Sequence, residues 1–372
     1  MKVIVVGAGA LGTMHAWHAV RRGHEVVHLE REPEARGASV RNFGLVWVGG
    51  RSVGPDLDTA LRARQLWGEI AAEVPGLGFR ASGSLTVVRT EAEWAVAAEA
   101  VARPDAAVRG WELLDEAGTR KANPLLRGPL LGALWSPHDA QVDPRGAQRA
   151  LQAHLTASGR YTLLTGREVR EVVGENAVRD DHGEAHVGDV VFLCTGAWLG
   201  GLVRELAPRL PVRRVRLQMM QTDPIGEHLP TSVADGDSFR YYPAYQGPAL
   251  DALNAAQPQH ETASAHRMQL LLVQRGDGSL TIGDTHEYDQ PFAFDTVDEP
   301  YAYLQALVEE LLGRPVTVRR RWAGVYAQCL DPGAVLHRER VREGVWLVTG
   351  PGGRGMTGSP AMAEKTIEEA GL

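Results

Sequence analysis

The chain has 372 residues, a formal net charge of -7 and a pI near 6.0, so it lacks the basic field that attracts polyphosphates. We therefore expect no nucleic acid partner. The two cysteines, Cys194 and Cys329, are too few for a disulfide framework, and their spacing is not that of metal ligands. No apolar segment approaches the roughly 20 residues that span a bilayer. We predict no metal site, no membrane span and a cytoplasmic location.

The first 30 residues have the pattern of a βαβ unit. Strands are predicted at 2–6 and 25–30, with a helix at 13–22. Between the first strand and the helix lies Gly7-Ala8-Gly9-Ala10-Leu11-Gly12, a GxGxxG motif. Its first glycine permits a tight turn, its second lets amides approach a pyrophosphate, and its third lets the helix pack closely on the strand. With the positive end of the helix dipole, this motif predicts a dinucleotide site.

Glu30 stands at the end of the second predicted strand, roughly 20 residues after the glycines. Its carboxylate can accept hydrogen bonds from a ribose diol at that position. An acidic residue there disfavours the additional phosphate of NADP. FAD and NAD share the fingerprint, so these residues leave the choice between the two open.

The next part of the chain is predicted to be mainly helical and then mainly extended. Residues 54–127 are alanine-rich and helical in pattern, with a strand-like run at 83–89. A strand and turn at 133–143 precede a helix that begins near Pro144, since proline suits the first helical turn. The short strands predicted after it are 160–173, 177–179, 184–187 and 189–194, with a hairpin turn at 180–183.

From residue 212 onward, alternating segments rich in aromatic residues predict a mostly antiparallel sheet. Residues 252–265 are polar and have no apolar period, so we expect an exposed loop there. A helix is predicted at 299–312. The strands predicted in this region are 217–222, 239–245, 268–274 and 280–284.

The C-terminal region repeats the order of strand, glycine turn and helix, at 344–349, 350–358 and 360–370. This turn offers a second set of free amides and a second helix dipole. A reduced flavin carries negative charge over N1 and the C2 carbonyl, which a helix N-terminus stabilises, whereas nicotinamide gains no such charge on reduction. Two such turns therefore favour FAD, and they place both ends of the chain in one domain.

Five motifs in order carry a family resemblance. They are the GxGxxG with Glu30, Gly37-Ala38-Ser39-Val40-Arg41-Asn42-Phe43-Gly44, Cys194-Thr195-Gly196-Ala197-Trp198, Arg321-Trp322-Ala323-Gly324 and the terminal glycine turn. Over nearly the whole chain they resemble the D-amino acid oxidase, glycine oxidase and sarcosine oxidase superfamily of FAD-dependent oxidoreductases. Within it, the chain is similar to a branch associated with phosphonate catabolism.

The resemblance implies an α/β fold with two domains. A Rossmann-type, glutathione-reductase-like FAD-binding domain would comprise residues 1–80, 140–215 and 325–372. An inserted α+β substrate-binding domain on a mainly antiparallel sheet would comprise residues 81–139 and 216–324.

The resemblance also implies positions along the cofactor. Arg31 would lie near the adenosine, Ser39 near the pyrophosphate, and Val169 against the adenine through its backbone. Each position has a simpler structural interpretation: Asn42 caps a turn, for example, and Trp198 belongs to a core. The predicted cofactor-binding residues are Gly7, Gly9, Ala10, Leu11, Gly12, Glu30, Arg31, Ser39, Arg41, Asn42, Phe43, Gly44, Val169, Thr195, Gly196, Trp198, Gly353, Gly355, Met356 and Thr357.

The chain departs from the superfamily at positions that bear on its chemistry. Members that attach flavin covalently use a cysteine near the position of Val325, but Cys329 comes a few residues too late, so we expect non-covalent FAD. Members that react rapidly with O2 use a lysine near the flavin, and no lysine lies between Lys121 and Lys365. Thr357 stands where a second lysine would hold a substrate carboxylate. The electron acceptor is thus left open as O2 or another oxidant.

We predict His286, Tyr242 and Arg354 as the catalytic-site residues, because imidazolium, phenol and guanidinium groups suit a carboxylate or phosphonate. His286 would anchor the substrate or activate O2. The expected reaction is FAD-dependent oxidation of a small anionic amine, such as an amino acid, an N-methyl amine or an aminophosphonate. The imine product would hydrolyse to an aldehyde or keto compound. Further candidates are Arg240, Tyr241 and Tyr245.

Two alternatives stay open. In a flavin-dependent hydroxy-acid or alcohol dehydrogenase, His286 would be the base that removes a hydroxyl proton. In the other alternative, the chain is the FAD-binding subunit of a heteromeric dehydrogenase. The sequence leaves the stereochemistry of the substrate and the oligomeric state open as well.

Overall fold

The computed structural model describes residues 1–372 and begins with a six-stranded sheet in the order β18-β19-β12-β1-β2-β8. All its neighbouring strands are parallel except β18 and β19. Strands from both ends of the chain lie in this sheet, as the two glycine turns predict. The strands are β1 (Lys2–Val6), β2 (Glu25–Glu30), β8 (Tyr161–Thr165), β12 (Val190–Leu193), β18 (His337–Arg342) and β19 (Val345–Thr349).

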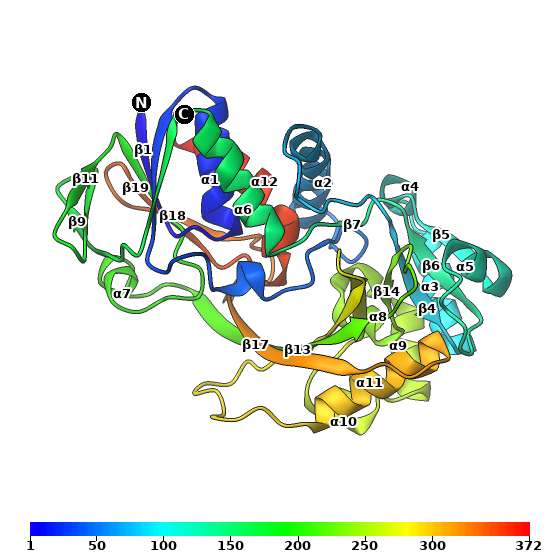
Figure 1. Ribbon diagram of the computed structural model, residues 1–372. Coiled ribbons are helices and arrows are strands. Elements are labelled where there is room, and N and C mark those ends of the chain that lie inside the picture. The colour runs from blue at the N-terminus through cyan, green and yellow to red at the C-terminus, as the bar shows by residue number, and fades with distance from the viewer.

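The two faces of this sheet are covered by different elements (Figure 1). Side chains alternate along a strand, so Val3 and Val5 face one side and Ile4 the other. Val3 and Val5 pack against helices α1 (Ala10–Arg21), α2 (Pro55–Glu73), α6 (Gly146–Ala157) and α12 (Gly355–Glu369). Ile4 packs toward helix α7 (Leu202–Leu206) and an antiparallel sheet of β9 (Val169–Val173), β10 (Ala177–Asp180) and β11 (Ala185–Val187).

Helix α12 packs along α1, although their sequences lie at opposite ends of the chain. His18 Nε2 lies 2.9 Å from the Pro360 carbonyl oxygen, and Arg22 forms an ion pair with Glu368 at 3.3 Å. The prediction that this helix begins at residue 360 is wrong, because Gly355 already starts it. Pro360 is therefore inside the helix, within its first two turns.

An eight-stranded sheet forms the second part of the molecule, in the order β17-β13-β16-β15-β14-β4-β6-β5. All neighbours are antiparallel except β14 and β4, which confirms the prediction of a mainly antiparallel sheet. Its strands are β4 (Ser84–Val88), β5 (Glu112–Asp115), β6 (Gly132–Ser136), β13 (Val212–Pro224), β14 (Ser232–Ala234), β15 (Leu271–Gln274), β16 (Ser279–Gly283) and β17 (Val318–Cys329). Its helices include α3 (Glu91–Val101), α4 (Ala106–Arg109), α5 (Glu116–Ala122) and α11 (Glu299–Leu312).

The long strands β13 and β17 connect the two parts of the molecule (Figure 1). They run across the predicted domain boundaries at 215 and 325, which stay a prediction. At its end, β17 meets the C-terminal glycine turn, where the Cys329 amide donates to the Gly350 carbonyl at 3.0 Å. The ends of these strands thus lie beside the first sheet, and the chain passes between the two sheets through residues 194–211 and 330–336.

Two predictions in the region after β14 are wrong. Residues 239–245 form helix α8 (Asp237–Tyr241) and a 3-10 turn (Pro243–Tyr245) instead of a strand. Pro243 cannot donate a hydrogen bond to a sheet ladder, so the aromatic alternation is misleading there. Residues 252–265 are not a loop but form most of helices α9 (Pro248–Ala256) and α10 (Glu261–Ala265), with Leu253 buried.

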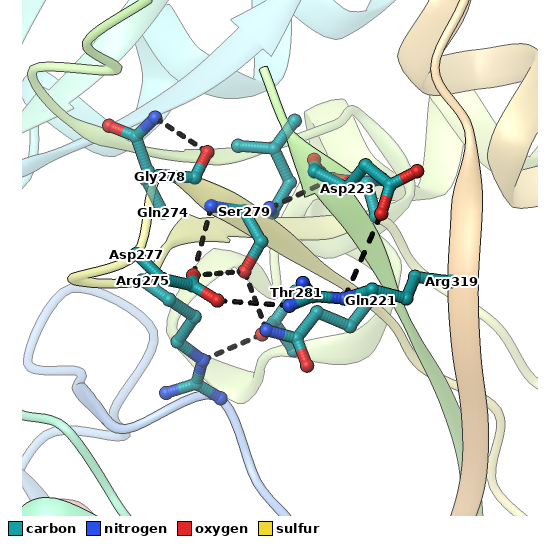
Figure 2. Close-up of polar contacts among 11 residues, drawn as sticks. Gln221, Asp223, Gln274, Arg275, Asp277, Gly278, Ser279, Thr281 and Arg319 are labelled. Carbon is teal, nitrogen blue, oxygen red and sulfur yellow. Dashed lines mark hydrogen bonds and ion pairs between the residues drawn. The ribbon is translucent and has the colours of Figure 1, made fainter. Parts of the chain in front are cut away.

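The hairpin between β15 and β16 is fastened to the N-terminal part of the chain by Arg275, and Figure 2 shows the contact of this side chain with Thr281. The Nε of Arg275 donates to Thr281 Oγ1 at 2.7 Å, and Nη2 donates to the Asn42 carbonyl at 2.7 Å. In the same network, Asp277 pairs with Arg319 at 2.9 Å. Burial lowers the pKa of Arg275 to about 10. The loop at 37–44 is therefore held against the second sheet by a buried cation.

Strand β3 (Leu45–Val46) directly follows this loop and pairs with β7 (Ala140–Gln141) in a short antiparallel sheet. None of the helices combines the length and the apolar character needed to cross a membrane.

Candidate active site

A cavity of about 890 Å³ is lined by residues from both parts of the molecule. Ligand pockets in proteins typically measure about 300–1,000 Å³, so this volume suits a large cofactor and a small substrate. The predicted cofactor-binding residues line this cavity with the exception of Gly44. The predicted catalytic residues His286, Tyr242 and Arg354 line the same cavity. Residues far apart in the sequence are thus brought to one site.

The N-terminal glycines fit their predicted roles. Gly7 has φ +95°, and a Cβ there would lie 2.4 Å from the Cys194 carbonyl oxygen. A Cβ at Gly12 would lie 2.0 Å from the Gly7 carbonyl oxygen, so only glycine lets α1 start this close to β1. The amides of Leu11 and Gly12, in the first turn of α1, have no acceptor within the helix. This end of the cavity can therefore hold a pyrophosphate.

The loop at 37–44 completes this end of the cavity. Ser39 Oγ accepts a hydrogen bond from the Ala10 amide at 2.8 Å, which joins the loop to α1. Asn42 Nδ2 donates to the Ala38 carbonyl at 2.8 Å, and its Oδ1 accepts from the Gly44 amide at 2.6 Å. Asn42 thus closes a turn as well as lining the cavity. Gly44 stands outside the lining and serves packing, since a Cβ there would lie 2.0 Å from the Val142 carbonyl oxygen.

Glu30 marks the next part of the cavity. Its carboxylate accepts the Ala8 amide at 2.8 Å and the Glu32 amide at 3.1 Å, so it shapes the glycine turn in addition to facing the cavity. The Arg31 guanidinium lies 4.1 Å from the centre of the Trp198 ring, which is half exposed. Trp198 is therefore not a core residue but stacks with Arg31 in the wall of the cavity.

The C-terminal turn faces the same cavity. Thr357 Oγ1 accepts the Trp47 amide at 2.9 Å and donates to the Leu45 carbonyl at 3.2 Å. The Arg354 guanidinium donates to the Ala334 carbonyl at 2.9 Å and lies 3.5 Å from Asp56 Oδ1. Helix α12 begins here, so its positive dipole end lies at the cavity.

The other end of the cavity is walled by aromatic rings in contact. Trp47 stacks on Tyr242 at 5.6 Å between centroids, Tyr242 meets Tyr241 edge-on at 5.0 Å, and Tyr241 stacks on His286 at 4.4 Å. Tyr288 stacks on the far side of His286 at 6.2 Å. Burial raises the pKa of the Tyr242 phenol above its usual range, so that hydroxyl is a neutral donor.

Two of the candidates from the sequence lie away from the cavity. Arg240 donates from Nε to Asp237 at 2.9 Å and from Nη2 to the Gln257 carbonyl at 2.6 Å, within its own helical region. Tyr245 is buried between Trp111 and Phe239. The helical course of this segment points Tyr241 and Tyr242 to the site and removes Arg240 and Tyr245 from it.

The structure adds three residues that sequence reasoning missed: Arg51, Gln269 and Asp284. All three are buried and line the cavity at the aromatic end. Arg51 follows a Gly-Gly pair, and Asp284 directly follows strand β16. A polar residue at a strand end was the available signal for Asp284. Arg51 has no comparable local signal.

A cluster of Asp180, Glu184 and His186 on the β10–β11 hairpin has the residue types of a metal site. Arg167 pairs with Asp180 at 2.7 Å and with Glu184 at 3.0 Å, and His186 Nε2 lies 3.0 Å from Asp180. These contacts supply the carboxylates with positive charge from the protein itself. The cluster lies apart from the cavity lining, so we assign it to hairpin stability.

FAD fits this cavity on two grounds. The glycine turns leave space and free amides that a larger residue would remove. In addition, polar atoms of the lining are buried without a partner in the chain, whereas buried polar groups are normally hydrogen-bonded. A ligand would supply these partners. The atoms are Trp47 Nε1, Thr195 Oγ1, Arg214 Nε, Gln269 Oε1, Asp284 Oδ1 and the Tyr326 hydroxyl.

The fold and the cavity define a dinucleotide-dependent oxidoreductase, and comparison with known proteins defines the family. The chain matches the model of the FAD dependent oxidoreductase (DAO) family over residues 2–369, and it belongs to that family. It is an FAD-dependent oxidoreductase, and the preference for FAD over NAD, drawn from the two glycine turns, is confirmed.

Glycine oxidase from Pseudomonas putida is 26% identical over 382 residues, covering 98% of this chain and 92% of that protein. A putative thiamine biosynthesis oxidoreductase ThiO from Rhizobium etli is 34% identical over 227 residues, 59% of this chain and 60% of the relative's length. The match thus spans less than two thirds of the second relative. Among solved structures, glycine oxidase from Bacillus cereus superposes with a TM-score of 0.80 at 17% identity, covering 100% of this chain and 94% of that one.

Proposed function

We propose that the chain oxidises the C–N bond of a small amine that carries an anionic group, giving an imine that hydrolyses to an aldehyde or keto product. The observation that carries this proposal is Arg51. Its guanidinium is buried at the aromatic end of the cavity and makes no ion pair within the chain. A buried cation without a paired anion is costly, so an anionic ligand stabilises it.

The contacts of Arg51 leave part of its guanidinium group free to bind a ligand. Nε donates to the Trp47 carbonyl at 2.9 Å and Nη2 lies 3.4 Å from Thr357 Oγ1, while Nη1 has no hydrogen-bond partner in the chain. The Tyr242 ring stacks on Trp47, whose carbonyl accepts from Arg51, and both Tyr242 and Arg51 line the cavity. A carboxylate or phosphonate can therefore accept from both side chains.

Arg354 and His286 remain proposed anchors beside Arg51. The Arg354 guanidinium already contacts Asp56 and the Ala334 carbonyl, so Arg51 is better placed to bind the anion. The aromatic wall excludes water from the substrate, and His286 is held by a hydrogen bond of 2.9 Å to the Arg267 carbonyl. When bound, FAD supplies the two-electron oxidation.

The proposal includes non-covalent FAD and a reducing cytoplasm. Cys329 lies outside the cavity lining, and the Cys194 thiol is buried beside His15 at 3.7 Å, so neither thiol is offered to a flavin. Both cysteines are free. Acid precipitation is expected to release the flavin into the supernatant, and yellow colour retained in the pellet would contradict this part.

The test is anaerobic reduction of the FAD-loaded protein by glycine, sarcosine, D-alanine, aminoethylphosphonate and its N-methyl form. We expect one of these to bleach the flavin absorbance. Glycine and the aminophosphonates differ in the anion, which separates a carboxylate site from a phosphonate site. A yellow protein that no amine bleaches would overturn the proposal.

One observation supports a second candidate, oxidation of a hydroxy acid or alcohol. Because His286 Nδ1 faces the Arg267 carbonyl, Nε2 is the nitrogen available to accept a hydroxyl proton, and it lies 3.9 Å from Asp284 Oδ2. Bleaching by a 2-hydroxy acid but by no amine would favour this candidate.

A further inference from the structure

The aromatic end of the cavity contains a buried carboxylate that no cation in the chain neutralises by contact. Asp284 is 6% exposed, its Oδ1 has no hydrogen-bond partner, and its only ion-pair neighbour is His286 at 3.9 Å. The other buried carboxylates have closer partners: Asp180 pairs with Arg167 at 2.7 Å, Asp139 accepts from the Val48 and Gly49 amides and the Ser84 hydroxyl, and Asp235 accepts from the Leu270 amide. Asp284 therefore differs from the carboxylates that serve folding.

The surroundings of Asp284 are those of a site for an ammonium group. The side chains that line the same cavity around it are His286 from its own segment, Tyr241 and Tyr242 from the end of α8, and Tyr288 and Tyr326. A cation is attracted both by a carboxylate and by the faces of aromatic rings. Gln269, whose Oε1 is also unpartnered, adds a second acceptor.

The same cavity also holds Arg51, so the two ends of a bipolar ligand have separate partners. Tyr242 lies near both groups. Its ring stacks on Trp47, whose carbonyl accepts from Arg51, and it meets Tyr241, which stacks on His286 beside Asp284. A small zwitterion can lie between the two side chains, with its anionic group at Arg51 and its ammonium at Asp284.

We propose that Asp284 binds the protonated amino group of a zwitterionic substrate and takes the proton that must leave nitrogen before the C–N bond is oxidised. In this step an N–H bond breaks and an O–H bond forms on the carboxylate, and no electron is transferred. Oxidation then proceeds from the neutral amine, with bound FAD as the oxidant. His286 acts as a positioning residue that keeps its Nε2 beside the Asp284 carboxylate.

Burial supports this assignment. It raises the pKa of the Asp284 carboxyl above its ordinary value, partly offset by His286. A carboxylate with a raised pKa is a better proton acceptor than an exposed aspartate. The cost of burying it is consistent with a role in binding rather than in folding.

The inference rests on the proposed amine oxidation, and its experiment is chosen so that the two can fail separately. The FAD-loaded protein is titrated calorimetrically with 2-aminoisobutyrate and with pivalate. The two carboxylates have similar shapes, but an ammonium of zwitterionic 2-aminoisobutyrate replaces a methyl of pivalate. Neither has a hydrogen on the carbon that bears the carboxylate, so binding is measured without turnover.

We expect wild-type protein to bind 2-aminoisobutyrate at least about tenfold more tightly than pivalate, and Asp284→Asn to remove that preference. Asp277→Asn is the matched control, because Asp277 lies outside the cavity lining and pairs with Arg319 (Figure 2). Equal binding of both ligands by the wild type, or binding of neither, would overturn the inference without any variant.

The pH dependence gives a readout that a merely structural role would not change. If Asp284 binds the ammonium form, the proton of the ammonium stays in the complex and none is released on binding. The affinity of the wild type for 2-aminoisobutyrate then stays nearly constant between about pH 7 and 9. Asp284→Asn lacks the carboxylate and is expected to bind the neutral amine instead. The fraction of neutral amine rises about tenfold per pH unit in this range, so the affinity of the variant should rise by up to about tenfold per pH unit. A rise of that size in the wild type would overturn the inference.

The outcomes separate the two proposals. Amine-dependent bleaching that Asp284→Asn leaves unchanged in rate and pH profile would remove the role of Asp284 and keep amine oxidation. Ammonium binding that depends on Asp284, in a protein that no amine reduces, would keep the site and remove amine oxidation.

Discussion

The two ends of the cavity differ in whether backbone groups or side chains form their walls. The cofactor end is made of backbone: the close approach at Gly7 and Gly12, the free amides of α1, and the start of α12. The aromatic end is made of side chains from separate elements, with Arg51 and Asp284 as its charges. Backbone geometry holds what every member of the family binds, whereas side chains can change without disturbing the fold. If the two ends bind cofactor and substrate as proposed, substitutions at one end should leave the other largely intact.

The strongest test of this contrast is Gly12→Ala. Its Cβ would lie 2.0 Å from the Gly7 carbonyl oxygen, and backbone cannot yield as a flexible side chain can, so we expect the purified protein to lose bound FAD. Flavin absorbance per mole of protein measures the effect. Gly276→Ala is the control, because nothing lies within 4 Å of a Cβ there. Full FAD occupancy in Gly12→Ala would refute the claim that FAD binding depends on the close backbone approach at Gly12.

The two ends also differ in how their buried groups respond to pH. Burial lowers the pKa of His28 to about 4, from 6.5, and His15 and His18 near it on the cofactor side are lowered to about 3 and about 4. Their contribution to stability is full above pH 6.5 and is lost as the pH falls toward the folded values. Asp284 has the opposite sign, because its raised pKa favours the folded state at low pH.

We therefore expect acid to destabilise the protein through its cofactor half. Between pH 7 and 5, His28 alone removes roughly 2 kcal/mol of unfolding free energy. Urea unfolding at a series of pH values measures this, with His28→Gln expected to flatten the curve below about pH 6.5. His182→Gln, at an exposed position, should leave the curve as in the wild type. A curve in which both variants match the wild type would contradict the assignment.

At the aromatic end, Arg51→Gln should weaken binding of the anionic ligand without releasing FAD. Loss of a charge-assisted hydrogen bond and of a buried cation is worth roughly 1.5–3 kcal/mol, or about 10- to 150-fold in KM. Arg354→Gln is the informative comparison, since its guanidinium already contacts Asp56. A larger effect at Arg354 than at Arg51 would reverse the order of the two anchors.

The smallest expected effect is that of Glu30→Gln at the cofactor end. The amide can accept at one position only, so either the Ala8 or the Glu32 N–H loses its acceptor. We expect FAD affinity to fall by about tenfold, or ~1.4 kcal/mol. Fluorescence titration of the apoprotein with FAD measures the change. An unchanged affinity would mean that Glu30 contributes to neither the turn nor the ribose.

The sequence features that rest on local spacing could be read from the sequence. The glycine turn, Glu30 and the strand–turn–helix order at the C-terminus are local, and each contributes residues to the cavity lining, while their roles in binding FAD stay a prediction. Arg51 and Asp284 escaped notice because their meaning arises only when distant segments meet. No motif surrounds either residue: Asp284 is marked only by its place at the end of β16, and Arg51 only by its burial without an ion pair.

The errors have local causes as well. In residues 239–245 the alternating aromatics resemble a strand, but Pro243 and the turn-forming Gly236 were signals against one. In residues 248–256, Gly247 followed by Pro248 is a helix start, and Leu250 and Leu253 have helical spacing. Polar composition hid this helix because only one narrow face of it is buried.

The packing of α12 on α1 has a consequence for biosynthesis. His18 contacts Pro360 and Met14 shares a core with Ile367, so the dinucleotide turn of the first dozen residues rests on a helix made more than 300 positions later. A ribosome extends a chain at about 5–20 residues per second, which leaves the nascent N-terminal unit without its partner for many seconds. Stable capture of FAD therefore belongs to the finished polypeptide, and loss of residues 355–372 would disable a binding motif at the opposite terminus.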